Sequence, residues 1–262
     1  MQKLLSKRQF AQIIPWSVPI ALIILWQLLV QFGWLSTRVL PAPTAVIQAG
    51  IHLLSTGELL HHITVSATRA LTGFVIGGGI GFFLGLLNGI SAPSEKLLDT
   101  SLQMLRNIPH LAMIPLVILW FGIGESAKLF MVSAGVLFPI YLDTFHGVRT
   151  VDRGLLEMGR VYGLKPLELF WQIILPSALP SILNGVRFAL GIMWLTLIVA
   201  ETIAADSGIG YMAMNAREFM QTDVVVFSIL VYALLGKLAD VMARFLEEKL
   251  LAWHPSYQTN NV

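Results

Sequence analysis

The sequence predicts an all-α integral membrane protein that forms a single membrane domain, residues 1–262, with about six transmembrane helices. Of the 262 residues, 56% are hydrophobic and 12% are charged, whereas about 25% of the residues in an ordinary soluble domain are charged. The runs 11–37 and 70–94 contain no ionisable residue. Each run is longer than the roughly 20 apolar residues that cross a bilayer as a helix, so both are predicted to span the membrane.

The first run begins after Lys3, Lys7 and Arg8, as a secretory signal does. It is too long for a signal, however, and no small-residue cleavage site closes it, so we predict a retained first helix. Residues 1–67 then form this span and an outer loop, and residues 68–245 form the core transmembrane domain. Because the chain has no cysteine, disulfides and thiolate metal sites are excluded.

The second run carries a stripe of small residues on one helix face. Its glycines recur every four residues, which lets a neighbouring backbone approach closely in a bilayer. Two interpretations remain open, packing within the chain and packing against a second subunit. The five residues are Gly73, Gly77, Gly81, Gly85 and Gly89.

Four further spans are predicted at residues 103–122, 128–145, 180–201 and 224–244. Pro109 and Pro115 interrupt the third span and Pro139 interrupts the fourth. Each proline removes a helix hydrogen bond that must be replaced inside the membrane. The interruptions are therefore either ordinary kinks or broken helices that line a translocation path.

The distribution of Lys and Arg orients these spans, because both residue types concentrate in cytoplasmic segments. With both termini in the cytoplasm, the outer loops hold only Arg38, Lys128 and Arg217, with Arg69 at a span edge. The inner segments hold Lys3, Lys7, Arg8, Lys96, Arg149, Arg153, Arg160, Lys165, Arg244 and Lys249. This bias places residues 148–176 in the cytoplasm. The net charge of +2 is too small to indicate a nucleic-acid partner.

The cytoplasmic segment 148–176 reads as two short helices joined by a glycine bend. Asp152 lies near a helix start, Gly163 suits a left-handed cap, and Pro166 can begin a second helix that runs through Trp171. The sequence "ILPSALP" then redirects the chain into the fifth span. The first helix has an apolar side suited to docking, formed by Leu155, Leu156, Met158, Val161 and Tyr162.

The spacing in this segment resembles the coupling loop of ABC importer permeases. Glu157 is followed by Gly159, Gly163, Ile173, Leu175 and Pro176, which matches Glu-Ala-Ala, three residues, Gly, nine residues, Ile-x-Leu-Pro. Met158 and Gly159 replace the paired alanines, and Met158 is bulkier. The resemblance implies that Glu157, Met158, Gly159, Arg160, Tyr162, Gly163, Ile173, Leu175 and Pro176 form the contact with a separate ATP-hydrolysing subunit.

The chain itself has no phosphate-binding loop of the G-x-x-x-x-G-K-[ST] type. The fragments "GLKP" at Gly163 and "GKLA" at Gly236 lack the earlier glycine and the Ser or Thr that would bind magnesium. We therefore expect no catalytic residue, no metal site and no cofactor in this chain. The resemblance implies that ATP and Mg²⁺ bind the partner subunit.

The resemblance extends over nearly the whole chain, including "GWLSTRVLPAP", "FPIYLDTFHGVR" and "GVRFALGIMWLTLIVAETIAADSGIGYMAMNAREFMQTD". These segments are similar to the aliphatic sulfonate branch of bacterial ABC importer permeases, whose close relatives handle taurine, nitrate or thiamine precursors. The resemblance implies a type I (MetI-like) transmembrane domain in the bacterial inner membrane. It also implies two permease copies, two ATPase subunits and an extracytoplasmic solute-binding protein.

Ionisable groups at membrane depth are candidates for the solute path, because burying them in a bilayer is costly. Arg106 and His110 are expected one turn apart in the third span, Arg187 early in the fifth, and Glu201 at its end. Arginine can bind a sulfonate through charge-assisted hydrogen bonds. The alternatives are pairing and snorkelling for the arginines and packing for His110. Lys237 and Asp240 are spaced to pair with each other on the sixth span.

Three other classes of membrane protein are possible from the span count alone. An ion-coupled secondary transporter would explain the spans and the buried charges, but it would not explain the coupling-loop spacing. An intramembrane enzyme is disfavoured because neither H-E-x-x-H nor G-x-S-x-G occurs. A structural scaffold would need no docking loop.

Overall fold

The computed structural model describes the backbone of residues 2–254 and the side chains of residues 17–203 and 205–254. Helices make up all of its regular structure in this range, as the sequence predicts. In chain order they are α1 (Gln2–Gln31), α2 (Pro43–Ser55), α3 (Glu58–Ile90), α4 (Ala92–Arg106), η1 (His110–Met113), α5 (Ile114–Phe121), α6 (Glu125–Arg149), α7 (Arg153–Val161), α8 (Pro166–Leu169), η2 (Phe170–Ile174), α9 (Leu175–Ala204), α10 (Ile209–Glu218) and α11 (Thr222–Leu250).

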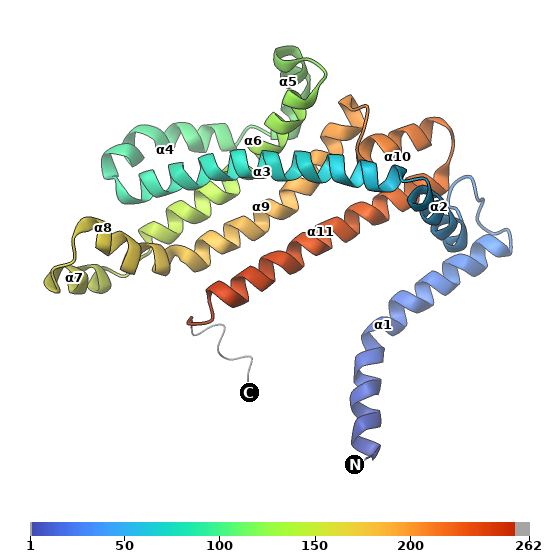
Figure 1. The fold of residues 1–262 in the computed structure, drawn as a ribbon, viewed down its shortest axis with the longest axis horizontal. Helices are drawn as coiled ribbons and strands as arrows, with labels where there is room; N and C mark the ends of the chain where they lie inside the picture. Colours follow the sequence, from blue (N-terminus) through green and yellow to red (C-terminus); the bar gives the residue numbers. More distant parts are fainter. Residues whose placement is uncertain (1, 255–262) are drawn as a thin grey trace.

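The long helices α3, α6, α9 and α11 form an elongated bundle (Figure 1). The short helices α7 and α8 lie at one end of this bundle, and α2 and α10 lie at the other. Helix α1 leaves the bundle and contacts it at α2. The turn between α3 and α4 lies at the same end as α7, so the segments predicted to be cytoplasmic gather there.

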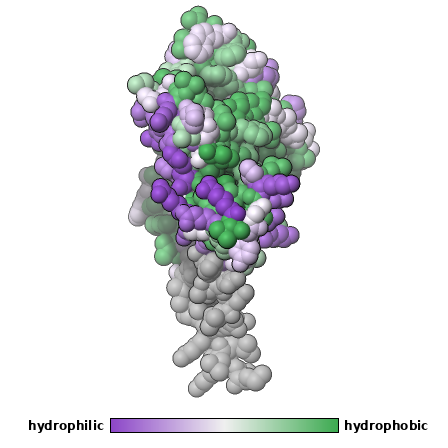
Figure 2. Space-filling view, turned by 90° about the vertical axis from the view of Figure 1, so that its left-hand side faces the viewer, coloured by the Kyte–Doolittle hydropathy of each residue, from purple (hydrophilic) through white to green (hydrophobic). Residues whose placement is uncertain are grey.

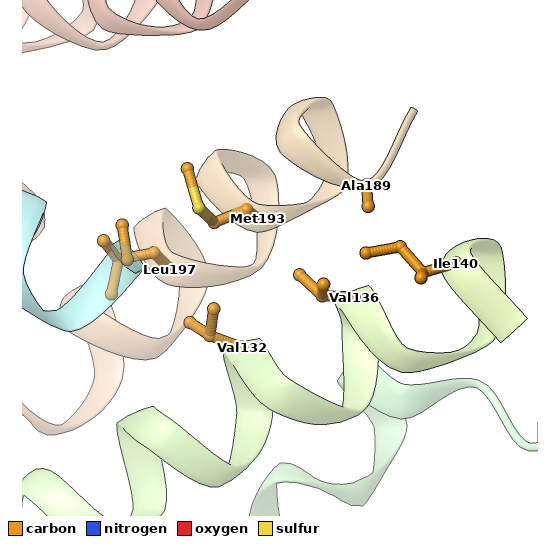
Figure 3. Close-up of a cluster of buried hydrophobic side chains, with 7 residues drawn as sticks. Val132, Val136, Ile140, Ala189, Met193 and Leu197 are labelled. Carbon is orange, nitrogen blue, oxygen red and sulfur yellow. The ribbon is translucent and has the colours of Figure 1, made fainter. Parts of the chain in front are cut away.

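The central core lies where α3, α6 and α9 meet. Val132, Val136 and Ile140 of α6 face Ala189, Met193 and Leu197 of α9 across this contact (Figure 3). The side chains recur every three or four residues on each helix, which is the spacing of one helix face. All six side chains are buried, so they hold α6 and α9 side by side at the centre of the bundle.

The glycine stripe of α3 lies against α6. A Cβ atom added at Gly77 would lie 2.1 Å from the Ser133 carbonyl oxygen, and one at Gly81 would lie 2.3 Å from that of Leu137. A Cβ added at the other three glycines would lie 2.6 to 2.7 Å from side chains of α6, at Val132 for Gly73, Thr144 for Gly85 and Val148 for Gly89. Of the two interpretations left open, the structure therefore shows packing within the chain.

The predicted third span, 103–122, is a broken helix, which is one of the two alternatives left open for its prolines. Helix α4 ends at Arg106, and η1 and α5 follow at an angle of 79° after a break at residues 107–109. Pro109 disfavours a helical conformation at Ile108 and lacks the backbone N–H that a continuing helix needs. By contrast, α6 runs through Pro139 without ending.

Within the described residues, four helical segments are long and apolar enough to cross a membrane. They are α3, α6, α11 and residues 166–203, and the bent pair of α4 with η1–α5 gives up to a fifth. The described apolar part of α1, Ser17–Gln31, is shorter. The sequence predicts about six spans. The two predicted spans that are not single long apolar helices in the described residues are α1 and the bent pair.

The start of the fifth span also differs from the prediction. The second short helix does not stop after Trp171, and "ILPSALP" does not redirect the chain. Instead α8 continues through the π-helical turn η2 into α9, and residues 166–203 form one helical segment. Leu175 N donates to Phe170 O, an i→i−5 bond that carries the helix up to Pro176, which has no N–H to donate.

Candidate functional site

Helix α7 is defined by capping interactions at both ends. Asp152 Oδ1 accepts a hydrogen bond of 2.6 Å from Gly154 N at the start of the helix. At the other end, Gly163 N donates to Arg160 O and Leu164 N donates to Gly159 O, both at 3.0 Å. This pair of bonds is a Schellman motif, and Gly163 has the left-handed φ of +79° that the motif requires. The predicted start and end of α7 are confirmed.

One face of α7 packs onto α8 and η2. Val151, Leu169 and Ile173 form a small buried cluster, and Leu156 and Leu164 lie against it. Gly159 lies over this cluster, because a Cβ added there would be 2.6 Å from Leu169 Cδ1 and from Ile173 Cδ1. The small residue at position 159 therefore serves packing within the chain, which sequence spacing alone did not reveal.

The opposite face of α7 is exposed. Tyr162 is 80% exposed, Met158 is 46% exposed, and the charged Glu157 and Arg160 lie beside them. Leu155, Val161, Leu167 and Trp171 are exposed nearby on the same loop. Figure 2 shows hydrophilic side chains gathered at this end of the molecule, with hydrophobic side chains exposed between them. A mixed surface of this kind can dock another protein through apolar contacts bordered by charges.

The nine residues predicted to couple the loop to an ATPase thus divide into two groups. Five are exposed and available to a partner, namely Glu157, Met158, Arg160, Tyr162 and Gly163. Four support the loop from within, because Gly159 and Ile173 are buried and Leu175 and Pro176 are half-buried.

The bend at residues 107–109 separates Arg106 from His110. The expectation that they lie one turn apart in one helix is wrong, since Arg106 ends α4 and His110 begins η1. Arg106 is exposed. His110 is half-buried, with Nε2 at 3.2 Å from Oγ1 of the buried Thr196, so it fixes η1 to α9.

Arg187 joins α9 to α11. Its Nε lies 2.9 Å from Asp240 Oδ1, and its Nη1 lies 3.7 Å from Glu247 Oε2. Asp240 also accepts from Lys237 at 3.1 Å and from Arg244 at 3.2 Å. The predicted pair of Lys237 with Asp240 is therefore confirmed, and it is part of a larger ionic cluster.

Glu201 lies in the protein interior and does not face a path. It is 1% exposed, and its carboxylate accepts hydrogen bonds from Ser66 Oγ, Arg69 Nη1, Gly210 N and Tyr232 Oη, at distances of 2.8 to 3.0 Å. Four donors occupy both oxygens, so none is left for a solute. The expectation that Glu201 lines the solute path does not fit this burial.

The same network contains residues that sequence reasoning missed. Arg69 is 4% exposed and also binds Glu125 of α6, whose Oε1 pairs with the buried Lys128 at 3.0 Å. The only sign of them in the sequence is that each is a charged residue at the edge of a predicted span. Their pairing joins helices far apart in the sequence, so spacing could not reveal it.

The loop before α10 belongs to this network as well. Gly208 is buried, and a Cβ added there would lie 2.3 Å from Glu201 Oε1. Gly208 N donates to His62 Nδ1 at 3.1 Å, and Ser207 O accepts from Arg69. Outside the spans, the Ser207 hydroxyl donates to Asp206 and lowers the pKa of that exposed carboxyl.

Comparison with known families decides what kind of protein carries this loop. The family described as "Binding-protein-dependent transport system inner membrane component" matches residues 77–252, which include all of α6 to α11 and the α7 loop. The chain belongs to this family of permeases. The permease is accordingly a multi-pass component of the inner membrane and a transport subunit, and it is not itself catalytic.

Curated relatives resemble the permease over nearly its full length. The putative aliphatic sulfonates transport permease protein SsuC of Escherichia coli is 61% identical, with 96% of this chain and 95% of the relative covered. The protein of the same name from Bacillus subtilis is 46% identical over 92% and 87% of the two chains. The taurine transport system permease protein TauC of Escherichia coli is 33% identical over 90% and 88%.

Solved structures share the fold of the permease. An amino acid ABC transporter crystallised with histidines matches with a TM-score of 0.58 at 16% identity, covering 74% of this chain and 97% of that chain. The inward-facing MetNI methionine ABC transporter matches with a TM-score of 0.53 at 20% identity, covering 75% and 98%. The permease therefore has the transmembrane fold of MetI-type ABC importers. A binding-protein-dependent system implies an ATPase and a binding protein as its partners.

Proposed function

We propose that this permease carries aliphatic sulfonates across the bacterial inner membrane, driven by ATP that a separate subunit hydrolyses. The observation that carries the proposal is the 61% identity, over 96% of the chain, to a relative named as an aliphatic sulfonates transport permease. Taurine is the second candidate, supported by the 33% identity to a taurine permease. Both solutes are organic sulfonates, and one panel of solutes separates them.

The α7 loop is the contact that transmits force from the ATPase in this proposal. Its exposed face combines Met158 and Tyr162 with Glu157 and Arg160, while caps and a buried cluster hold the helix in place. A helix that is docked at one end of the bundle can pass a displacement on to α9, because α7 packs against α8 and η2 and η2 makes α8 continuous with α9. The docking role is supported by the residue spacing from Glu157 to Pro176, which matches the coupling loop of ABC importer permeases.

The complete importer in this proposal contains two copies of the permease, two ATPase subunits that hold ATP and Mg²⁺, and an extracytoplasmic solute-binding protein. Both termini lie in the cytoplasm. The concentration of Lys and Arg near α7 and in the last turns of α11, with Arg244 and Lys249, supports this orientation. Two alternating states, each favoured by a different ligand, then move the solute.

Uptake measurements test the solute and the energy source together. Proteoliposomes that contain the assembled importer are supplied with its binding protein and a panel of alkanesulfonates, taurine and nitrate. We expect uptake of alkanesulfonates that requires ATP and persists when ion gradients are collapsed. Uptake that follows an ion gradient without ATP, or a preference for taurine or nitrate, would contradict the proposal.

The role of α7 is tested by reversing one exposed charge at each end of the molecule. Glu157→Arg should lower co-purification of the ATPase and ATP-driven uptake. Glu218→Arg, at the exposed C-terminal end of α10 and at the opposite end of the bundle, should leave ATPase binding unchanged. If both variants retained the ATPase equally well, α7 would not be the docking site.

A further inference from the structure

A cavity of about 650 Å³ lies between α6, α9 and α11. Its size is within the range of about 300–1,000 Å³ that is typical of small-molecule sites. Helix α9 contributes one face to it, through residues spaced three or four apart. They are Asn184, Arg187, Phe188, Gly191, Ile192 and Leu195. Asp143 of α6 and Asp240 of α11 complete the polar end.

Charged side chains beside this cavity are exposed at membrane depth. Lys237 is near the middle of α11, roughly 20 Å from either end of the helix, and its side chain is 64% exposed. Arg187, inside the helical segment 166–203, is 36% exposed. Charges at this depth are costly against lipid tails, and they face water or other protein. The cavity between α6, α9 and α11 therefore does not face lipid.

The lining of the cavity is polar at one end and apolar along the rest. Asn184 and Arg187 form the polar end with the two aspartates, and Phe188, Ile192 and Leu195 continue along α9. An alkanesulfonate has the same division, with an anionic head and an apolar tail. The Arg187 guanidinium can donate charge-assisted hydrogen bonds to sulfonate oxygens.

We propose that this cavity lines the water-filled path and holds the solute in transit, with the sulfonate head at Arg187 and the alkyl tail along Phe188, Ile192 and Leu195. This inference rests on the proposed function. Asp240 is the internal partner of Arg187 at 2.9 Å when no solute is bound. Because Asp240 competes with the sulfonate for Arg187, the solute is bound weakly. A transport path requires weak sites of this kind, which the solute can leave again.

Cysteine labelling tests the exposure of the cavity to water, and the natural chain has no cysteine to interfere. Gly191 and Gly236 both line the cavity, and a Cβ added at either has nothing within 4 Å. Gly79 of α3 has equally open space and lies among the exposed apolar residues Val75, Ile76 and Ile80. Gly191→Cys and Gly236→Cys thus have a matched lipid-facing control in Gly79→Cys.

The reagent is 2-sulfonatoethyl methanethiosulfonate, which is charged and is itself an alkanesulfonate. In membrane vesicles with the assembled importer, it should modify positions 191 and 236 about 100-fold faster than position 79, because charge is excluded from hydrocarbon. Excess hexanesulfonate should slow the reaction at position 191. After the protein is unfolded in SDS, N-ethylmaleimide should modify all three positions, because every thiol is then in water. If the charged reagent reacted no faster at 191 and 236 than at 79, the cavity would face lipid and the proposal would fail.

Substitutions of the ion pair test the binding role. Arg187→Gln should raise the KM for alkanesulfonates about ten- to hundredfold, the range of one charge-assisted hydrogen bond, and Arg187→Lys should restore part of the loss. Asp240→Asn should act in the opposite direction, with a lower KM and slower turnover. Arg38→Gln, at an exposed position in the loop before α2, is the matched control. Unchanged KM values in Arg187→Gln, in an importer whose wild type transports sulfonates, would refute this site and leave the proposed function intact. Absence of sulfonate uptake by the wild type would refute the proposed function instead.

Discussion

The close contact of α3 with α6 makes Gly77 a sharp test of how the bundle is held together. In Gly77→Ala the new Cβ would lie 2.1 Å from the Ser133 carbonyl oxygen and 2.6 Å from Ser133 Cα. Both atoms belong to the α6 backbone, so neither can rotate aside. The two helices must separate locally by about 1 Å to restore ordinary van der Waals contact.

The cost of this separation can be estimated from the structure. Overpacking of a tight contact costs about 1–3 kcal/mol. Separation also weakens the hydrogen bond of 3.1 Å from Ser133 Oγ to Gly73 O, which contributes about 1 kcal/mol. Replacing glycine by alanine in a helix returns up to about 1 kcal/mol. Gly79→Ala has the same helix gain with nothing within 4 Å of its Cβ, so the difference between the two variants isolates the steric cost at about 2–4 kcal/mol.

Unfolding of the purified permease in mixed detergent and SDS, followed by tryptophan fluorescence, measures this difference. Gly77→Ala should unfold at a lower SDS fraction than wild type, and Gly79→Ala at the same or a higher one. Equal stability of the two variants would refute the packing argument. Intact unfolding behaviour of Gly77→Ala together with loss of a dimer would place the stripe at a subunit interface instead.

Three further predictions concern the buried network and the α7 loop. Glu201→Gln removes one of the two carboxylates that pair with the buried Arg69 and should destabilise the fold by about 1.5–3 kcal/mol, since Glu125 remains as a partner. In a double-mutant cycle, Arg69→Met with Glu201→Gln should cost less than the sum of the single variants, and strict additivity would show that the two side chains do not interact. Gly163→Val should strain the left-handed backbone at this position by about 1–2 kcal/mol and lower co-purification of the ATPase. Asn tolerates the left-handed conformation, so Gly163→Asn should bind the ATPase as the wild type does. Equal ATPase recovery from both variants would argue against a role of the cap in docking. Asp152→Ala should destabilise α7 by about 1 kcal/mol, with Asp152→Ser close to wild type, as amide exchange in α7 would show; unchanged protection in the alanine variant would mean that the cap contributes nothing.

Local features of the chain could be predicted because each depends on neighbours in the sequence. Asp152 caps the helix that follows it, and Gly163 closes the same helix through bonds that span five residues or fewer. The glycines of α3 are visible as a stripe because helical geometry fixes their common face. The identity of the helix that covers this stripe was not predictable, because it depends on how α6 folds back.

Proline positions had opposite outcomes that depended on their surroundings. Pro109 follows a break in the helix, whereas Pro139 lies inside α6 and Pro176 lies at the start of α9 after a π-helical turn. A proline removes one hydrogen bond in every case. Whether the helix continues depends on how the residues before and after the proline pack against other helices. This packing exists only in the folded bundle.

The sequence by itself determined that the permease crosses a membrane and that residues 152–163 form a capped helix. These properties follow from composition and from short-range bonds. The tertiary structure decided which charges are partners. Glu201 and Arg187 looked alike as isolated ions in one span, yet the fold encloses Glu201 among four donors and leaves Arg187 beside a cavity. The physical reason is that the free energy of a charge in a membrane depends on its partners, and here those partners come from other helices.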